Sequence, residues 1–205
     1  MIVIADSTPL NYLILIHQVD LLPQLFDRIL IPPAVFEELQ HQETPDVVRR
    51  WIASPPSWLQ VQALRSVLDP ALGFLDPGER EAIALAEELQ ADQLLLDDAD
   101  ARREAARRNL PFIGTLGVLR EAARRELLDL RVVLVQLQET SFFVDPALIK
   151  SLLDEEARRK QRSRWATVEE PLRVPATRPP DAPSVHHPST AGPTRRPRLS
   201  EFDTF

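Results

Sequence analysis

Short apolar segments alternate with amphipathic ones from the first residue to about Glu156. The apolar runs are rich in Val, Ile and Leu, as is typical of strands buried on both faces of a parallel sheet. The amphipathic segments repeat apolar residues every three or four positions, which is the helical period. The predicted strands are 2–5, 28–31, 94–96 and 111–113, and the predicted helices are 10–16, 34–40, 82–89, 99–108 and 116–126.

Prolines and capping residues mark the starts of these helices. Pro9 follows Ser7 and Thr8, Pro33 opens the next helix, and Asp76-Pro77-Gly78-Glu79 has the form of a capping box. The alternation of strand and helix predicts an α/β fold, a three-layer α/β/α sandwich around a mainly parallel sheet.

The chain after the last predicted strand is less regular. Residues 131–138 are β-branched enough for a strand, yet they could equally form a helix. Asp145 and Pro146 cap and open a final helix that is expected to reach about Lys160.

The last segment, residues 157–205, differs in composition from the rest. It has ten basic and five acidic residues, whereas the preceding part has 14 basic and 26 acidic ones. It also holds eight of the 19 prolines and has almost no periodic apolar pattern. We therefore predict a domain over residues 1–156, followed by a basic, proline-rich, disordered tail. A solvated extension without a fixed role is the simplest interpretation of that tail, and arginine contacts with nucleic acid are the alternative.

The composition excludes several classes of protein. The chain has no cysteine, so it has no disulfide framework, no thiolate zinc site and no cysteine nucleophile. Its longest apolar runs, such as Tyr12–Ile16, are far shorter than the roughly 20 residues of a membrane-spanning helix. The N-terminal residues lack the basic region and cleavage site of a secretory signal, so we expect a cytoplasmic protein without membrane contact.

Acidic residues follow two of the predicted strands directly. Asp6 comes after strand 2–5, and the pair Asp97 and Asp98 comes after strand 94–96. Ligands of parallel α/β sheets collect beyond the carboxyl ends of the strands. These acids are therefore candidates for a functional site.

Two helix glutamates join them as candidates. Glu79 falls near Ile83 and Ala86 on the apolar face of its helix, where a carboxylate is unexpected. Glu38 lies on the flank of the apolar side of helix 34–40, whereas Glu37 lies nearly opposite that side. Glu38 is therefore the better candidate of the two.

Each acid also has a simpler structural interpretation. Asp6 could be a turn acid, Glu38 a solvated helix acid, and Glu79 only part of its capping box. Asp98 could cap a helix, and Asp97 is favoured as the capper or the bystander of that pair. The acids indicate a site only as a set, because carboxylates gathered without a counter-charge repel each other unless a divalent cation lies among them. Oxygen ligands favour Mg²⁺ or Mn²⁺, and such ions promote the attack of water on a phosphodiester.

The sequence resembles the PIN-domain nucleases over about residues 1–156, and most closely a bacterial, toxin-like branch of them. The segments that carry the resemblance are Ile2–Leu10, Ile31–Leu39, Leu75–Ala86, Leu94–Arg102 and Ile113–Gly117. The resemblance implies that Asp6, Glu38, Glu79 and Asp98 bind Mg²⁺ or Mn²⁺ for the hydrolysis of RNA. It also implies a small antitoxin as a partner, and a homodimer.

The match leaves some assignments open. The family often has Thr two residues before the last acid, where this chain has Leu96, so Asp97 and Asp98 are both candidates for the last ligand. Ser7 or Thr8 could support a metal-bound water, and Thr115 could assist at the far strand end. All three could equally be helix caps.

Arginines follow the last acid and are candidates for substrate binding. Arg102 and Arg103 could grip RNA phosphates beside the acidic pocket. The same holds for the later arginines Arg107, Arg108, Arg120, Arg124 and Arg125. Alternatively, these side chains form a solvated helix face and pair with the neighbouring acids Glu104, Glu121 and Glu126.

The leading functional hypothesis is a metal-dependent endoribonuclease that acts as the toxin of a toxin-antitoxin pair. The alternative is a catalytically inactive PIN scaffold that binds RNA or a protein. An aspartyl-phosphate enzyme would also place an acid after the first strand. It is disfavoured because residue 8 is Thr8 rather than a second Asp, and no well-placed Lys follows a late strand.

Overall fold

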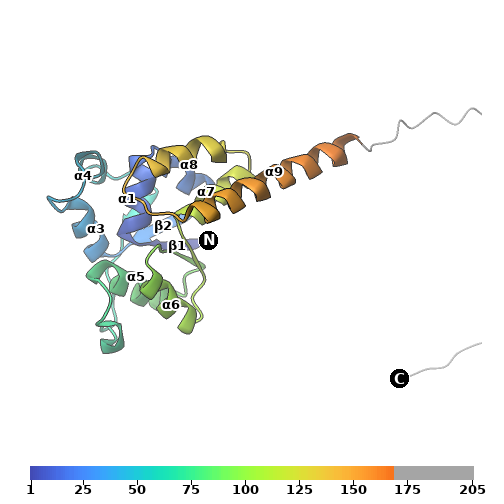
Figure 1. Ribbon diagram of the computed structural model, residues 1–205. Coiled ribbons are helices and arrows are strands. Elements are labelled where there is room, and N and C mark those ends of the chain that lie inside the picture. Colours follow the sequence, from blue (N-terminus) through green and yellow to red (C-terminus); the bar gives the residue numbers. More distant parts are fainter. Residues whose placement is uncertain (169–205) are drawn as a thin grey trace, which may run out of the picture. The chain divides into compact units, whose positions relative to one another are not determined.

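A five-stranded parallel sheet forms the centre of the computed structural model, which describes residues 1–168 (Figure 1). The strands lie in the order β3-β2-β1-β4-β5, and every neighbouring pair is parallel. Their bounds are β1 (Ile2–Ala5), β2 (Arg28–Ile31), β3 (Leu59–Val61), β4 (Gln93–Leu95) and β5 (Phe112–Ile113). The strand order reverses direction between β1 and β4, which is where ligands of open α/β sheets bind.

Helices cover both faces of this sheet, which confirms the predicted α/β/α sandwich. The longer α-helices are α1 (Ser7–Leu15), α3 (Pro33–Gln40), α4 (Asp46–Ile52), α5 (Pro77–Leu89), α6 (Ala99–Arg107), α7 (Thr115–Arg124), α8 (Leu130–Gln138) and α9 (Pro146–Val168). Shorter turns are η1 (Val19–Leu21), α2 (Leu22–Leu25) and η2 (Pro70–Leu72).

The strands feed two separate hydrophobic cores because successive side chains of a strand point to opposite faces. Val3 and Ala5 belong to the larger core, which they share with residues of α1, α3, α4, α7, α8 and α9. Ile4 belongs to the smaller core, beneath α5 and α6. This division explains why the strands read as continuous apolar runs in the sequence.

Residues 131–138, for which the sequence allowed a strand or a helix, are helical. Asp129 accepts a hydrogen bond from the Arg131 amide (2.9 Å) and caps α8. The buried residues Leu130, Val133, Leu134 and Leu137 recur at the helical period. Packing of that apolar stripe against the larger core therefore outweighs the β-branched composition.

Strand β3 and helix α4 were not predicted. Only Leu59 of the three β3 residues is buried, because β3 is an edge strand. Helix α4 has seven residues, and only two of them, Val48 and Ile52, are buried. Segments this short do not repeat a hydrophobic period often enough to be recognised.

Helix α9 continues to Val168, past the expected end near Lys160 (Figure 1). The first residues of the segment predicted as a disordered tail, 157–205, are therefore helical. The remainder, 169–205, lies outside the described residues, as do its predicted disorder and its nucleic-acid contacts. Among residues 1–168, no helix is long and apolar enough to cross a membrane.

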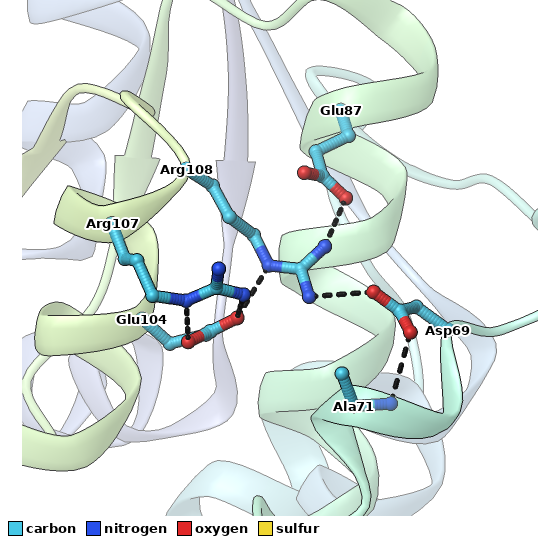
Figure 2. Close-up of polar contacts among 6 residues, drawn as sticks. All are labelled: Asp69, Ala71, Glu87, Glu104, Arg107 and Arg108. Atoms are coloured by element: carbon cyan, nitrogen blue, oxygen red, sulfur yellow. Dashed lines mark hydrogen bonds and ion pairs between the residues drawn. The ribbon is translucent and has the colours of Figure 1, made fainter.

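One guanidinium ties helix α6 to its neighbours on the side of the smaller core (Figure 2). Arg108 donates to Glu104 (2.6 Å), to Glu87 of α5 (2.8 Å) and to Asp69 at the start of η2 (2.7 Å). Arg107 also donates to Glu104, at 2.6 and 2.8 Å. Arg107 and Arg108 thus pair with Glu104. This agrees with the second interpretation of these arginines from the sequence, in which they pair with neighbouring acids and do not bind RNA phosphates.

Candidate metal centre

The candidate acids lie at the carboxyl edge of the sheet, where β1 and β4 are neighbours. Asp6 follows β1 at once, and its backbone N–H donates to the Leu95 carbonyl of β4 (3.0 Å). Asp97 follows two residues after Leu95. The parallel pairing of β1 and β4 therefore brings residues 91 positions apart in the chain to one edge.

Asp6 combines a structural bond with an unsatisfied atom. Its Oδ2 accepts from the Thr8 amide (3.2 Å) and caps helix α1, as the structural interpretation of the sequence required. The residue is 1% exposed, and its Oδ1 is buried without a hydrogen-bond partner in the described part of the chain. An unpaired buried carboxylate oxygen is costly, so capping alone does not account for Asp6.

The surroundings of Asp6 also disfavour its charged form. Burial raises its pKa to about 7, and the negative charges of Glu38 and Asp97 add to this effect, while the amides of Ser7 and Thr8 oppose it. Glu38 and Asp97 are thus within electrostatic reach of Asp6, from two different elements of the fold.

Glu38 is held by the N-terminus of another helix. Its Oε1 accepts from the amide of Gly78 in the first turn of α5 (2.7 Å). A Cβ atom at Gly78 would lie 2.5 Å from the Glu38 Oε2, so this approach requires glycine. In return, Glu81 of α5 accepts from the Ala34 amide of α3 (3.0 Å). The two helices exchange carboxylates at their N-terminal ends, where negative charge is favoured.

Glu79 forms the predicted capping box. It is also one of the candidate acids Asp6, Glu38, Glu79, Asp97 and Asp98, which together we call the acidic edge. Its Oε2 accepts from the Asp76 amide (3.2 Å). Burial raises the pKa of Glu79 to about 7, and the charges of Asp6, Asp98 and Asp76 contribute in the same direction, whereas the Asp76 amide opposes them. The Glu79 carboxyl therefore lies in the field of two other candidate acids.

Of the pair Asp97 and Asp98, it is Asp98 that caps a helix. Asp98 is the cap of α6, because its Oδ1 accepts from the amides of Asp100 (2.7 Å) and Ala101 (2.9 Å). Asp97, favoured from the sequence as capper or bystander, is neither. Asp97 instead crosses to α7, where its oxygens accept from the amide (2.9 Å) and the hydroxyl (2.5 Å) of Thr115. Burial raises the pKa of Asp97, against these bonds and the charge of Arg102.

Arg102 is fixed inside the site. Its Nε donates to the Leu96 carbonyl (2.7 Å) and its Nη2 to Asp97 (3.0 Å). Gly114 makes room for it, since a Cβ at that position would collide with the guanidinium. Arg103, by contrast, is 76% exposed at its side chain and pairs with Asp100.

Two clefts adjoin the acidic edge. The first, of about 620 Å³, includes Glu38 and Ser7 in its lining, and the second, of about 760 Å³, includes Glu79, Asp97 and Asp98. Thr8 lines both. The charges of Glu38, in the first cleft, and of Asp97, in the second, both raise the pKa of Asp6. Asp6 is therefore near the acids of both clefts.

The donor chemistry of this edge fits a hard divalent cation. Among residues 1–168, no three His, Cys, Asp or Glu side chains are already arranged as a set of metal ligands. The available donors are carboxylate oxygens, which Mg²⁺ and Mn²⁺ prefer, and the Asp6 Oδ1 has no other partner in that range. A bound cation would also remove the cost of placing these acids together.

Sequence reasoning missed the residues that hold the acids in place. An isolated sequence does not indicate the contacts of Gly78 with Glu38, of Gly114 with Arg102, or of Glu81 with α3, because the partners are far away in the chain. Thr115 was named, but its bond to Asp97 could not be foreseen, as Asp97 lies 18 positions earlier.

Comparison with known families now identifies the fold. A family model described as a PIN domain matches residues 2–158. The chain belongs to the PIN-domain family. The PIN domain spans all five strands and the acidic edge, from β1 into helix α9. PIN domains are generally nucleases, so the sheet and the helices around it form a nuclease fold. No curated protein matches this sequence.

Proposed function

We propose that this PIN domain is an endoribonuclease that requires Mg²⁺ or Mn²⁺. The observation that carries the proposal is the buried Oδ1 of Asp6, which has no partner among residues 1–168 and lies in the field of Glu38 and Asp97. A carboxylate kept in this state is costly to the fold, and a resident cation supplies the missing partner.

The proposed ligands are Asp6, Glu38, Glu79 and either Asp97 or Asp98. When bound, the ion provides a water of lowered pKa and stabilises the negative charge that develops on the phosphate. The chain's own contribution is to orient the carboxylates. The Gly78 amide fixes Glu38, and Thr115 and Arg102 fix Asp97. The Asp76 amide donates to the Oε2 of Glu79, which leaves the Glu79 Oε1 for the ion or for a proton.

Matched glutamate variants test the proposal. Glu38 and Glu81 each accept one amide from the first turn of the opposite helix, but only Glu38 lines a cleft at the acidic edge. In a cleavage assay with RNA and Mn²⁺, we expect Glu38→Gln to lose on the order of 100-fold in rate. Mutation of a residue that only orients a metal ligand already costs roughly 10- to 100-fold in activity. Glu81→Gln should stay within a few-fold of the parent.

Asp6→Asn provides the stricter version of this test. It retains the cap on α1, because Asn is also a good N-cap, but it removes the charge. Cleavage should then fall below detection. Full activity of Asp6→Asn, or cleavage that persists in a chelator, would overturn the proposed function.

The toxin role, the small antitoxin and the homodimer remain predictions from the family resemblance. Growth arrest on expression, abolished by Asp6→Asn, would support a toxin. Size-exclusion chromatography with light scattering would measure the oligomeric state of the full chain.

A catalytically inactive scaffold is the second candidate. It is favoured by the absence of three preassembled metal ligands in the described residues. Calorimetric titration of the full chain with Mn²⁺ separates the two candidates, because an inactive scaffold should show no saturable heat.

A further inference from the structure

The second cleft continues from the acids into an apolar wall. Besides Glu79, Asp97 and Asp98, its lining includes the apolar residues Phe112, Ile113, Leu116, Phe142, Phe143, Val144, Leu148 and Leu152. The first cleft, by comparison, is lined largely by hydroxyl, amide, carboxylate and imidazole side chains. Of the two clefts, the second therefore has more apolar residues beside the acids in its lining.

Phe143 is the most unusual residue of this wall. Its side chain is 91% exposed, whereas the neighbouring Phe142 packs edge-on against Tyr12, with ring centroids 4.7 Å apart. The Tyr12 hydroxyl is also within hydrogen-bond distance of the Ser141 hydroxyl (3.1 Å). These contacts anchor the loop before α9 to helix α1. An exposed phenyl ring thus projects from an anchored loop at the cleft.

A cation lies in the same lining. Arg120 of α7 is 56% exposed at its side chain, and its ion pair with Glu155 is long (3.7 Å) and solvated. Such a pair contributes little, so the guanidinium can turn toward another anion at small cost. The cleft therefore combines acids that suit a phosphate-bound cation, an aromatic ring and an accessible positive charge.

We propose that the second cleft binds an unpaired nucleobase, stacked on Phe143, beside the phosphodiester held at the acidic edge. This inference rests on the proposed function for the position of the phosphodiester. A base within a duplex has both faces covered by its neighbours, so the cleft accepts single-stranded RNA and excludes paired RNA. Stacking on an aromatic ring tolerates any base, so the subsite sets strandedness rather than sequence.

Fluorescence of a stacked base measures this contact without cleavage. The full chain is titrated, with Ca²⁺ in place of Mn²⁺, into a short single-stranded RNA that contains 2-aminopurine. We expect binding to quench the fluorophore. Phe143→Ala should weaken binding roughly 5- to 100-fold, the range for loss of one stacked base, and Phe143→Trp should restore it.

An exposed phenylalanine elsewhere supplies the matched control. Phe74 is 63% exposed and lies outside the linings of both clefts. Phe74→Ala should leave both the quench and the affinity unchanged. Because Phe143 is exposed in the same way, its replacement by Ala should leave the fold intact, which circular dichroism would check.

An abasic scan of the RNA locates the subsite. A nucleotide without its base, moved along the strand, should weaken binding most at one position, and that penalty should vanish in Phe143→Ala because the two changes remove the same contact. Equal quenching by the parent and Phe143→Ala, or equal affinity for a duplex, would overturn the inference. So would unchanged RNA binding with loss of self-association, which would make Phe143 a protein contact.

The outcomes also separate this inference from the proposed function. If Phe143-dependent stacking is found but no divalent metal supports cleavage, the nuclease proposal fails and the subsite stands. If metal-dependent cleavage is found and Phe143→Ala has no effect on binding, the subsite alone fails.

Discussion

The molecule holds two groups of carboxylates that differ in their supply of positive charge. Around Arg108, the acids Asp69, Glu87 and Glu104 all accept from one guanidinium (Figure 2). The hydrogen bonds of Arg107 and Arg108 lower the pKa of Glu104 to about 2, and that of Arg108 lowers the pKa of Asp69. At the acidic edge, burial and like charges raise the pKa of Asp6 to about 7, and that of Glu79 likewise.

The contrast agrees with the proposal that the acidic edge takes its positive charge from a bound cation. Arg102 compensates Asp97, but among residues 1–168 the hydrogen bonds to Asp6, Glu38 and Glu79 come from backbone amides only. The Arg108 group reaches its charged state with residues of this chain alone. At the acidic edge, protonation of Asp6 and Glu79, or a cation from outside the chain, would offset their charges.

The pH dependence of stability gives the largest expected difference between the two groups. In metal-free protein, Asp6 keeps its proton up to about pH 7, whereas in the unfolded chain it ionises near pH 4. The folded state binds more protons in this window, so stability falls as the pH rises from 4 to 7. For a group this buried, the loss should be on the order of 2–4 kcal/mol.

Urea unfolding of metal-free parent and Asp6→Asn at several pH values isolates this effect. The stability of Asp6→Asn relative to the parent should increase between pH 4 and 7 and stay level above pH 7. Added Mn²⁺ should reduce the difference by stabilising only the parent. Parallel stability curves of the two proteins would contradict the raised pKa of Asp6.

Removal of Arg108 should convert the compensated group into an uncompensated one. Arg108→Ala leaves three carboxylates without their common partner, and we expect a loss of about 2–3 kcal/mol. This is below the cost for a fully buried pair, because Asp69 and Glu87 are 45% and 39% exposed at their side chains. Urea unfolding at pH 7 measures it.

Arg103→Ala is the control for that variant. Arg103 belongs to the same helix and pairs with the exposed Asp100, so its removal should cost less than about 1 kcal/mol. Equal losses in Arg103→Ala and Arg108→Ala would show that the Arg108 group has no special part in stability. RNA cleavage should be retained by both variants once they are folded.

The sequence predicts strands β1, β2, β4 and β5, and the acids that follow β1 and β4, for a simple physical reason. Buried parallel strands are apolar throughout, so an acid at the end of such a run, as at Asp6, is visible without any partner. The i to i+4 pair of Glu104 and Arg108 is visible in the same way. Asp69 and Glu87 also accept hydrogen bonds from Arg108, but they come from other elements, so these two contacts are not visible in the sequence.

The exact contacts within the site escape sequence reasoning because they cross between elements. Either Asp97 or Asp98 can cap a helix by composition, and only the position of Thr115 on α7 decides which one crosses. The carboxylate exchange of Glu38 and Glu81 depends on the angle between α3 and α5, which no local pattern encodes.

Gly78→Ala should have the smallest effect on stability and a clear one on activity. The new Cβ would meet the Glu38 carboxylate at 2.5–2.8 Å, and since that group is the end of a flexible side chain, it moves while the backbone stays. Alanine is better than glycine by about 0.5–1 kcal/mol in a helix interior and by less at the second residue of α5, so unfolding should change little. With Glu38 displaced from the Gly78 amide, cleavage should fall roughly 10-fold.

Gly73→Ala, whose Cβ meets only the Pro70 carbonyl at 3.1 Å, should cleave at the parental rate. Equal rates for both variants would mean that the position of the Glu38 carboxylate does not matter for the reaction, and Glu38 would then be a structural link between α3 and α5.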